Sequence, residues 1–198
     1  MTFFRFLANR IAEWLVRNGG IRLEERELIA FGLDKFFSTI LCFVIAFALG
    51  LFFRVPIEVL VFYVSFYVLR IYAGGYHADT QLRCFIISIC VMIPPIAAIR
   101  YHLSWYSNFV HMICLACGAA VILILSPVDN KDKKLDMNER HIYRNRSLIA
   151  LSITGIFSTL LQFLSGPRFS SATICGILLA AVMAVSGKIK NSLQRSQY

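Results

Sequence analysis

The sequence has 198 residues, of which 58% are hydrophobic and only 16% charged, and its mean hydropathy is +0.68. This composition excludes an ordinary soluble globular domain, in which about a quarter of the residues are charged. The net charge of +9 does not indicate nucleic-acid binding, because most basic residues flank hydrophobic runs and form no patch with interleaved aromatic residues. We therefore expect an all-α, polytopic membrane protein.

Residues 1–35 predict amphipathic helices that lie at the cytoplasmic face of the membrane. Hydrophobic residues recur there at helical spacing, namely Phe3, Phe4, Leu7, Ile11, Trp14 and Leu15. Arginine, glutamate and asparagine alternate with them, and Gly19-Gly20 follow as a helix stop. A second short helix, rich in Glu and Arg, is predicted at about 23–31. The region lacks the pattern of a cleaved signal peptide.

Six hydrophobic segments follow, and we predict that each crosses the membrane as a helix. They lie at about 36–53, 55–69, 84–98, 109–125, 148–164 and 169–186. The first is the clearest, because it contains no charged residue. Several are shorter than the ~20 residues of an untilted span, so their ends are expected to extend into the interface. Residues 36–187 form the expected transmembrane domain, and residues 188–198 a basic cytoplasmic tail.

The distribution of basic residues predicts the orientation of the chain. If the six segments alternate in direction, all but three of the 20 basic residues fall on one side; the three exceptions are Arg54, Arg100 and Arg168. The side with more lysine and arginine in short loops tends to stay in the cytoplasm. Both termini and the loops 70–83 and 126–147 are therefore expected to be cytoplasmic.

The loop 70–83 gathers the most reactive side chains in the sequence and leads into Cys84. A cysteine becomes nucleophilic when a histidine, a cation or a helix N-terminus favours its thiolate. Cys84 follows Arg83 and is expected in the first turn of the third span, where the helix dipole is positive. His77 lies seven residues earlier, about 10 Å away along one continuous helix. Gly74-Gly75 supply a break that allows His77 to fold back towards Cys84.

Plainer interpretations of these residues stay open. A lone cysteine such as Cys84 near a membrane helix is usually structural or palmitoylated, and a lone loop histidine such as His77 is usually solvated. Asp79 either orients His77 or caps the following helix, and we favour the cap. Arg70 either donates to an oxyanion, as backbone N–H groups also can, or serves only as a topology anchor.

The string Arg70…Gly74-Gly75-Tyr76-His77-Ala78…Cys84, followed by Ser126-Pro127-Val128-Asp129-Asn130-Lys131, resembles the accessory gene regulator B (AgrB) family of bacterial quorum-sensing membrane endopeptidases. The resemblance extends to the length of the chain, the amphipathic N-terminal region, the spans and the second basic loop. It implies that Cys84 and His77 match the catalytic cysteine and histidine of the family. It also implies that Arg70 and Gly75 match residues of the family pattern.

The resemblance implies cleavage of an AgrD-like autoinducer propeptide near its C-terminus, with formation of a cyclic thiolactone or lactone. Cys84 would attack the peptide carbonyl after His77 accepts its proton, and the propeptide would remain as a thioester on Cys84. No cofactor, metal or nucleic acid is expected. The bilayer is the second partner, and a homodimer is expected through a face of small residues, namely Gly176, Ala180, Ala181 and Ala184.

The second cytoplasmic loop carries three closely spaced lysines, Lys131, Lys133 and Lys134. They are expected to set the topology and to contact anionic lipid. Binding of an acidic propeptide tail is an additional role that stays open. The alternative function is a small membrane transporter or scaffold with a structural Cys84. A transporter needs polar groups along a path through the membrane. Glu58 and Gln162 lie near the ends of their spans, so the sequence favours the enzyme.

Overall fold

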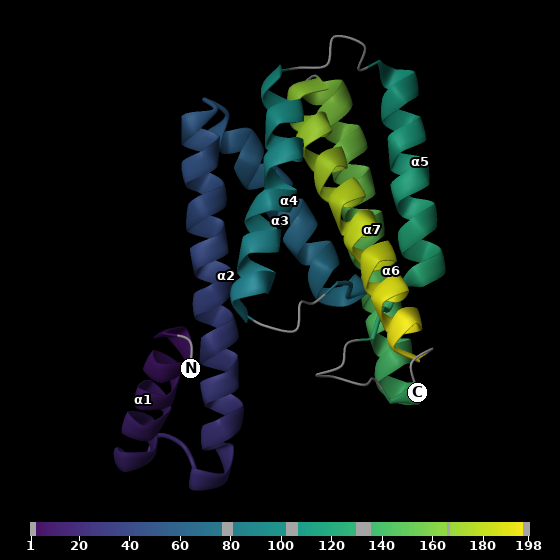
Figure 1. Ribbon diagram of the computed structural model, residues 1–198. Helices are drawn as coiled ribbons and strands as arrows, with labels where there is room; N and C mark the ends of the chain where they lie inside the picture. Colours follow the sequence, from purple (N-terminus) through teal and green to yellow (C-terminus); the bar gives the residue numbers. More distant parts are fainter. Residues whose placement is uncertain (1–2, 77–80, 102–106, 130–135, 166, 196–198) are drawn as a thin grey trace. The chain divides into compact units, whose positions relative to one another are not determined.

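The computed structural model describes residues 3–76, 81–101, 107–129, 136–165 and 167–195 (Figure 1). The described residues form seven α-helices and one short 3-10 turn, Leu23–Glu25. The helices are α1 (Phe3–Arg17), α2 (Arg26–Phe52), α3 (Pro56–Ala73), α4 (Gln81–Tyr101), α5 (Asn108–Leu125), α6 (Met137–Leu164) and α7 (Pro167–Arg195). No strand occurs within these ranges. The prediction of an all-α fold is confirmed.

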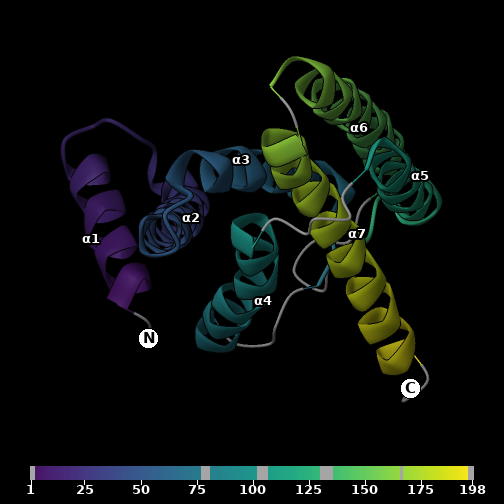
Figure 2. The ribbon, with the colours of Figure 1, turned by 90° about the horizontal axis from the view of Figure 1, so that it is seen from above.

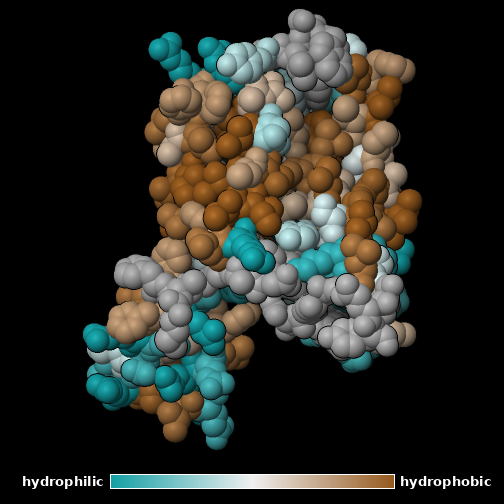
Figure 3. Space-filling view, in the orientation of Figure 1, coloured by the Kyte–Doolittle hydropathy of each residue, from teal (hydrophilic) through white to brown (hydrophobic). Residues whose placement is uncertain are grey.

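Six of these helices, α2 to α7, are long and hydrophobic enough to cross a membrane. The predicted number of spans is therefore confirmed, and the chain is a multi-pass membrane protein. The face in Figure 3 is mainly hydrophobic over the spanning helices, whereas hydrophilic residues gather around α1 and the start of α2. A hydrophobic exterior is what a protein needs when lipid tails surround it.

Most spanning helices are longer than we predicted, and α2, α6 and α7 differ most from their predicted spans. The prediction of a separate short helix at about 23–31 was wrong, because α2 already begins at Arg26. The residues from Arg26 onwards are mostly good helix formers, so nothing separates them from the span. Helix α6 begins at Met137, eleven residues before the predicted span, and the Asp136 N–H donates to Glu139 Oε2 at its start (3.3 Å). Helix α7 continues beyond residue 186 to Arg195.

The chain divides into two compact units, Met1–Ile45 with Ala78–Ile89 and Ala46–His77 with Cys90–Tyr198. The expected boundaries at residues 35 and 187 stay predictions. In the first unit, α1 packs antiparallel to the start of α2 (Figure 1). Arg26 pairs with Glu13 at 2.6 Å, and the rings of Phe4 and Phe37 stack with centroids 6.4 Å apart. These contacts fix one face of the amphipathic α1.

In the second unit, α7 is the central helix and contacts α3, α5 and α6. Seen from above, it crosses between α3 and the pair formed by α5 and α6 (Figure 2). In its spanning window 61% of the residues are buried, against 39% for α3. A Cβ added to Gly176 would lie 2.8 Å from the carbonyl oxygen of Phe62, so the two backbones approach closely.

The small residues expected to support a homodimer are used within the chain. Gly176 packs against α3, and Ala180, Ala181 and Ala184 are all buried. The expectation that this face of α7 is free for a second copy was wrong. Small residues do allow close helix packing in membranes, but here the partner is a helix of the same chain.

Polar contacts join the helix ends of the second unit at the end opposite to residues 70–76 and 126–129. Glu58 at the start of α3 is buried and pairs with Arg168 at the start of α7 (2.7 Å). Gln162 Nε2 donates to Asn108 Oδ1 (2.7 Å), and Ser170 Oγ donates to Gln162 Oε1. These interactions explain both polar residues as links between helices.

Candidate functional site

Helix α3 ends at Ala73, and the two glycines after it turn the chain. Gly74 has φ +74° and Gly75 has φ +133°, backbone conformations that glycine adopts and other residues rarely do. The Val128 N–H donates to the Ala73 carbonyl oxygen (2.9 Å), and Gly74 forms a parallel β-bridge with Val128. A Cβ on Gly74 would overlap the Val128 carbonyl group. The end of α3 is thus joined to the segment that follows α5.

The guanidinium of Arg70, in the last turn of α3, holds the two-glycine turn. Its Nη1 donates to the Gly74 carbonyl oxygen (2.5 Å), and its Nη2 donates to the Tyr76 carbonyl oxygen. A Cβ on Gly75 would overlap this guanidinium. Two donors on one planar group fix direction as well as distance. The backbone of residues 74–76 therefore follows a defined path up to the residue before His77.

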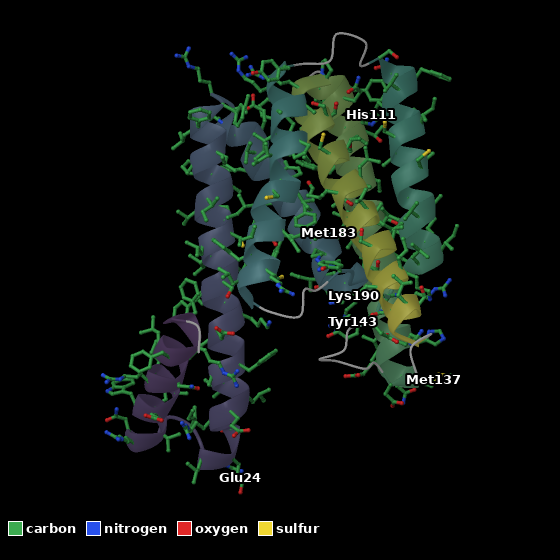
Figure 4. The ribbon with its side chains drawn as sticks, viewed as in Figure 1. Glu24, His111, Met137, Tyr143, Met183 and Lys190 are labelled. Carbon is green, nitrogen blue, oxygen red and sulfur yellow. The ribbon has the colours of Figure 1, made fainter. Side chains whose placement is uncertain are left out.

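Helix α7 forms the other side of this turn. The Tyr76 N–H donates to the Met183 carbonyl oxygen (2.8 Å). A Cβ on Gly187 would lie 2.5 Å from the Gly75 carbonyl carbon and 2.7 Å from the Tyr76 nitrogen. Lys190 Nζ lies 5.2 Å from the centroid of the Tyr76 ring, within the range of a cation–π interaction. Met183 and Lys190 lie along α7 in Figure 4, with His111 at the opposite end of this unit.

Asp129 links the same turn to α6 and α7. Its carboxylate pairs with Arg140 of α6, and its carbonyl oxygen accepts a hydrogen bond from Asn191 Nδ2 of α7 (2.7 Å). Asp129 Oδ1 is buried and has no hydrogen-bond partner among the residues that the structure describes. Arg70, Asp129, Arg140 and Asn191 thus gather at one end of the second unit, where charged side chains fit the membrane–water boundary.

Cys84 lies in the first unit, in the first turn of the described part of α4. Its side chain is half-buried, and its carbonyl oxygen accepts a hydrogen bond from Ser88 Oγ (2.8 Å). Arg83 beside it is exposed. All six cysteines are free. Cys84 therefore combines partial access with a position near the start of a helix, where a thiolate is favoured.

The sequence model of one protein family, described as accessory gene regulator B, matches residues 8–185. The chain belongs to the accessory gene regulator B family. The match includes the two-glycine turn, Cys84 and Asp129, whereas Gly187, Lys190 and Asn191 lie beyond its end. Membership places the chain in quorum-sensing peptide processing at a membrane, with an AgrD-like propeptide as its partner.

Three relatives illustrate how far the similarity extends. A putative AgrB-like protein of Clostridium perfringens (strain SM101 / Type A) is 21% identical over 168 residues, which cover 82% of this chain and 78% of that protein. The accessory gene regulator protein B of Staphylococcus carnosus (strain TM300) is 28% identical over 153 residues, 76% of each chain. A putative AgrB-like protein of Lactiplantibacillus plantarum (strain ATCC BAA-793 / NCIMB 8826 / WCFS1) is 24% identical over 181 residues, 90% of this chain and 88% of that protein. No solved structure is significantly similar.

The candidate site residues that we singled out from the sequence fall into three groups, according to where the structure places them. Arg70, Gly74 and Gly75 are brought together in the second unit, whereas Cys84 belongs to the first unit. Five further residues lie outside the described residues, namely His77, Asp79, Lys131, Lys133 and Lys134. Among the described residues, no group of three or more His, Cys, Asp or Glu side chains could hold a metal ion.

Sequence reasoning missed the contributions of Asp129, Gly187 and Asn191. Asp129 was quoted only as part of the second family string, although an acidic residue within a basic loop invites a search for its partner. Gly187 carried a weak signal, because a glycine inside a helical pattern often marks a close contact. Nothing in the sequence marked Asn191, which reaches a backbone carbonyl 62 positions away.

Proposed function

We propose that this chain is a membrane cysteine endopeptidase that cleaves an AgrD-like propeptide, with Cys84 as nucleophile and His77 as general base. The fixed path of residues 74–76 up to His77 carries this proposal. A general base must be held within hydrogen-bonding distance of the thiol it deprotonates, and a loop clamped by Arg70 is suited to that task. The half-buried position of Cys84 near the start of a helix supports its role as the nucleophile.

The proposed reaction has two acyl-transfer steps. His77 takes the proton of the Cys84 thiol, and the thiolate attacks the carbonyl carbon of the scissile peptide bond. The tetrahedral intermediate breaks its C–N bond, His77 returns the proton to the leaving amine, and the propeptide stays bound as a thioester. A thiol or hydroxyl within the propeptide then attacks the thioester, which closes a thiolactone or lactone and frees Cys84.

Arg70 acts in this proposal as a positioning residue. Both of its terminal nitrogens donate to backbone carbonyls of the turn, which favours this role over an oxyanion donor or a simple topology anchor. Oxyanion stabilisation is assigned to backbone N–H groups at the start of α4, where the helix dipole is positive. Asp79 keeps its two proposed roles, with the helix cap favoured.

We also propose that the active site and both termini face the cytoplasm of a bacterial cell. The excess of basic residues in the loops at that end supports this orientation. Lys131, Lys133 and Lys134 would then contact anionic lipid or an acidic propeptide tail. A homodimer stays a prediction, and it needs a surface other than the small-residue face of α7, which is buried within the chain.

The test is cleavage of a panel of AgrD-like propeptides by the full chain in liposomes, followed by mass spectrometry. We expect a released C-terminal fragment and a thioester adduct on Cys84 with the wild type. Both should be lost in Cys84→Ala, and the fragment should be strongly reduced in His77→Ala. Cys90→Ala is the matched control, since Cys90 is an exposed thiol six residues further along α4.

Cleavage that persists in Cys84→Ala would refute the proposed nucleophile. A chain that cleaves no propeptide but loses another membrane activity after changes inside its spans would support the transporter or scaffold instead.

A further inference from the structure

One face of the last part of α7 follows the turn that precedes His77. Met183, Gly187, Lys190 and Asn191 recur at spacings of four, three and one residues, which place them on the same side of a helix. Each contacts a different part of the turn or of the segment beside it. The sequence suggested only a basic tail after residue 187, so this region has a structural task that its composition does not reveal.

Gly187 allows the closest of these approaches. A glycine in a helix interior is less favourable than alanine, so its presence calls for a packing reason. The neighbours of an added Cβ would be the Gly75 carbonyl carbon at 2.5 Å and the Tyr76 nitrogen at 2.7 Å. Both are backbone atoms, which cannot rotate away as a flexible side chain can. Any side chain at position 187 therefore has to push the turn away from α7.

Asn191 holds the other side of the turn. Its amide donates to the carbonyl oxygen of Asp129, and Asp129 follows Val128, which forms the β-bridge with Gly74. One helix thus supports both segments of the bridge, one through Gly187 and the other through Asn191. Loss of either contact leaves the bridge held from one side only.

The backbone of Tyr76 is fixed at both ends of the residue. Its N–H is bound by the Met183 carbonyl of α7, and its carbonyl oxygen by the Arg70 guanidinium of α3. The next residue is His77. The direction in which the chain enters His77 is therefore set jointly by α3 and α7.

We propose that Gly187 and Asn191 are positioning residues of the active site, which set the placement of His77 through the backbone of residues 74–76. This inference rests on the proposed function, because it assumes His77 as the general base. A displacement of a catalytic group by about 1 Å can cost about 100-fold in rate. A small shift of the turn is thus sufficient to lower the rate without unfolding the helices.

The test compares Gly187→Ala with Gly155→Ala in liposomes. Gly155 is also a helix glycine, but among the described residues an added Cβ there would meet only a Leu115 methyl at 3.6 Å, an ordinary contact. We expect Gly187→Ala to lower kcat for propeptide cleavage about 10- to 100-fold, with KM within about twofold. The pH profile of Cys84 alkylation by iodoacetamide should move towards that of His77→Ala. Gly155→Ala should match the wild type in all three readouts.

Asn191→Ala, paired with Ser192→Ala, keeps the inference testable if Gly187→Ala does not fold. Within the part of the chain that the structure describes, the Ser192 hydroxyl donates only within its own helix, to the Ile189 carbonyl. Asn191→Ala should lower kcat and shift the alkylation profile, and Ser192→Ala should do neither. If Gly187→Ala and Asn191→Ala are folded and both keep the wild-type kcat and profile, the inference is wrong. Failure of the proposed function gives a different result, because Cys84→Ala and His77→Ala would then still cleave the propeptide.

Discussion

Arg70 Nη2 donates a hydrogen bond to the carbonyl oxygen of Tyr76, the residue directly before His77. The same guanidinium also holds the Gly74 carbonyl oxygen. A basic residue at a membrane boundary is commonly explained by topology alone. This geometry adds a reason for arginine in particular, because only a planar guanidinium supplies two donors in a fixed fork.

Arg70→Lys separates these two explanations. Lysine keeps the positive charge that sets topology but cannot bridge the two carbonyls in the same way. We expect kcat for propeptide cleavage to fall about 10- to 100-fold, with unchanged membrane insertion. Cleavage assays and cysteine accessibility mapping measure the two properties. Arg144→Lys, at an exposed position of α6, is the control, and equal activity of the two variants would mean that Arg70 serves topology only.

Gly75→Ala tests the close approach within the turn. The substitution puts a Cβ onto the Arg70 guanidinium in a backbone conformation of φ +133°, so it combines overlap with strain of about 1–3 kcal/mol. We expect lost cleavage activity and a lower Tm in detergent. Gly19→Ala shares the positive φ, but no atom of the described residues lies within 4 Å of the added Cβ. It should lower Tm modestly and keep activity, whereas matching losses in both variants would exclude the overlap as the cause.

The spans were predictable from the sequence, but their ends and their contacts were only partly so. Uncharged runs such as 36–53 identify a membrane helix because the cost of burying charge in lipid is large. The early start of α6 had a local signal as well, since Asp136 and Glu139 have the spacing of a capping box. The contact of Gly187 with Gly75 had only a weak signal, because a glycine inside a helix marks a close approach but not the segment that approaches. It depends on how two segments more than 100 positions apart approach each other, which no local pattern encodes.

The ion pair between the buried Glu58 and the half-exposed Arg168 is expected to act on stability and not on catalysis. Removing one partner of a buried pair is costly, although Arg168 is half-exposed here, so we expect Glu58→Gln to destabilise the protein by about 1–3 kcal/mol. Thermal unfolding in detergent measures this loss, and kcat per folded molecule should stay at the wild-type value. The double variant Glu58→Arg with Arg168→Glu should recover part of the stability. A lost membrane activity at full stability would favour the transporter interpretation of Glu58.

The free face of α1 is expected to lie in the membrane interface. Its buried face packs on α2, and the opposite side exposes Phe6, Leu7 and Trp14, the last 62% exposed. Arg10 lies among them, with its guanidinium 5.1 Å from the Phe6 ring centroid. Exposed aromatic residues with interspersed arginines are typical of helices that enter the headgroup region by about 5–10 Å.

Fluorescence quenching of Trp14 in a Trp105→Phe background tests this placement. Lipids brominated near the headgroup should quench Trp14 strongly, and aqueous iodide only weakly. The control moves the probe to position 5 by Arg5→Trp with Trp14→Phe, since nine residues amount to about half a turn around the helix. A tryptophan at position 5 should be quenched strongly by aqueous iodide and only weakly by the brominated lipids. Strong iodide quenching of Trp14, with no effect of the brominated lipids, would mean that α1 lies in the aqueous phase.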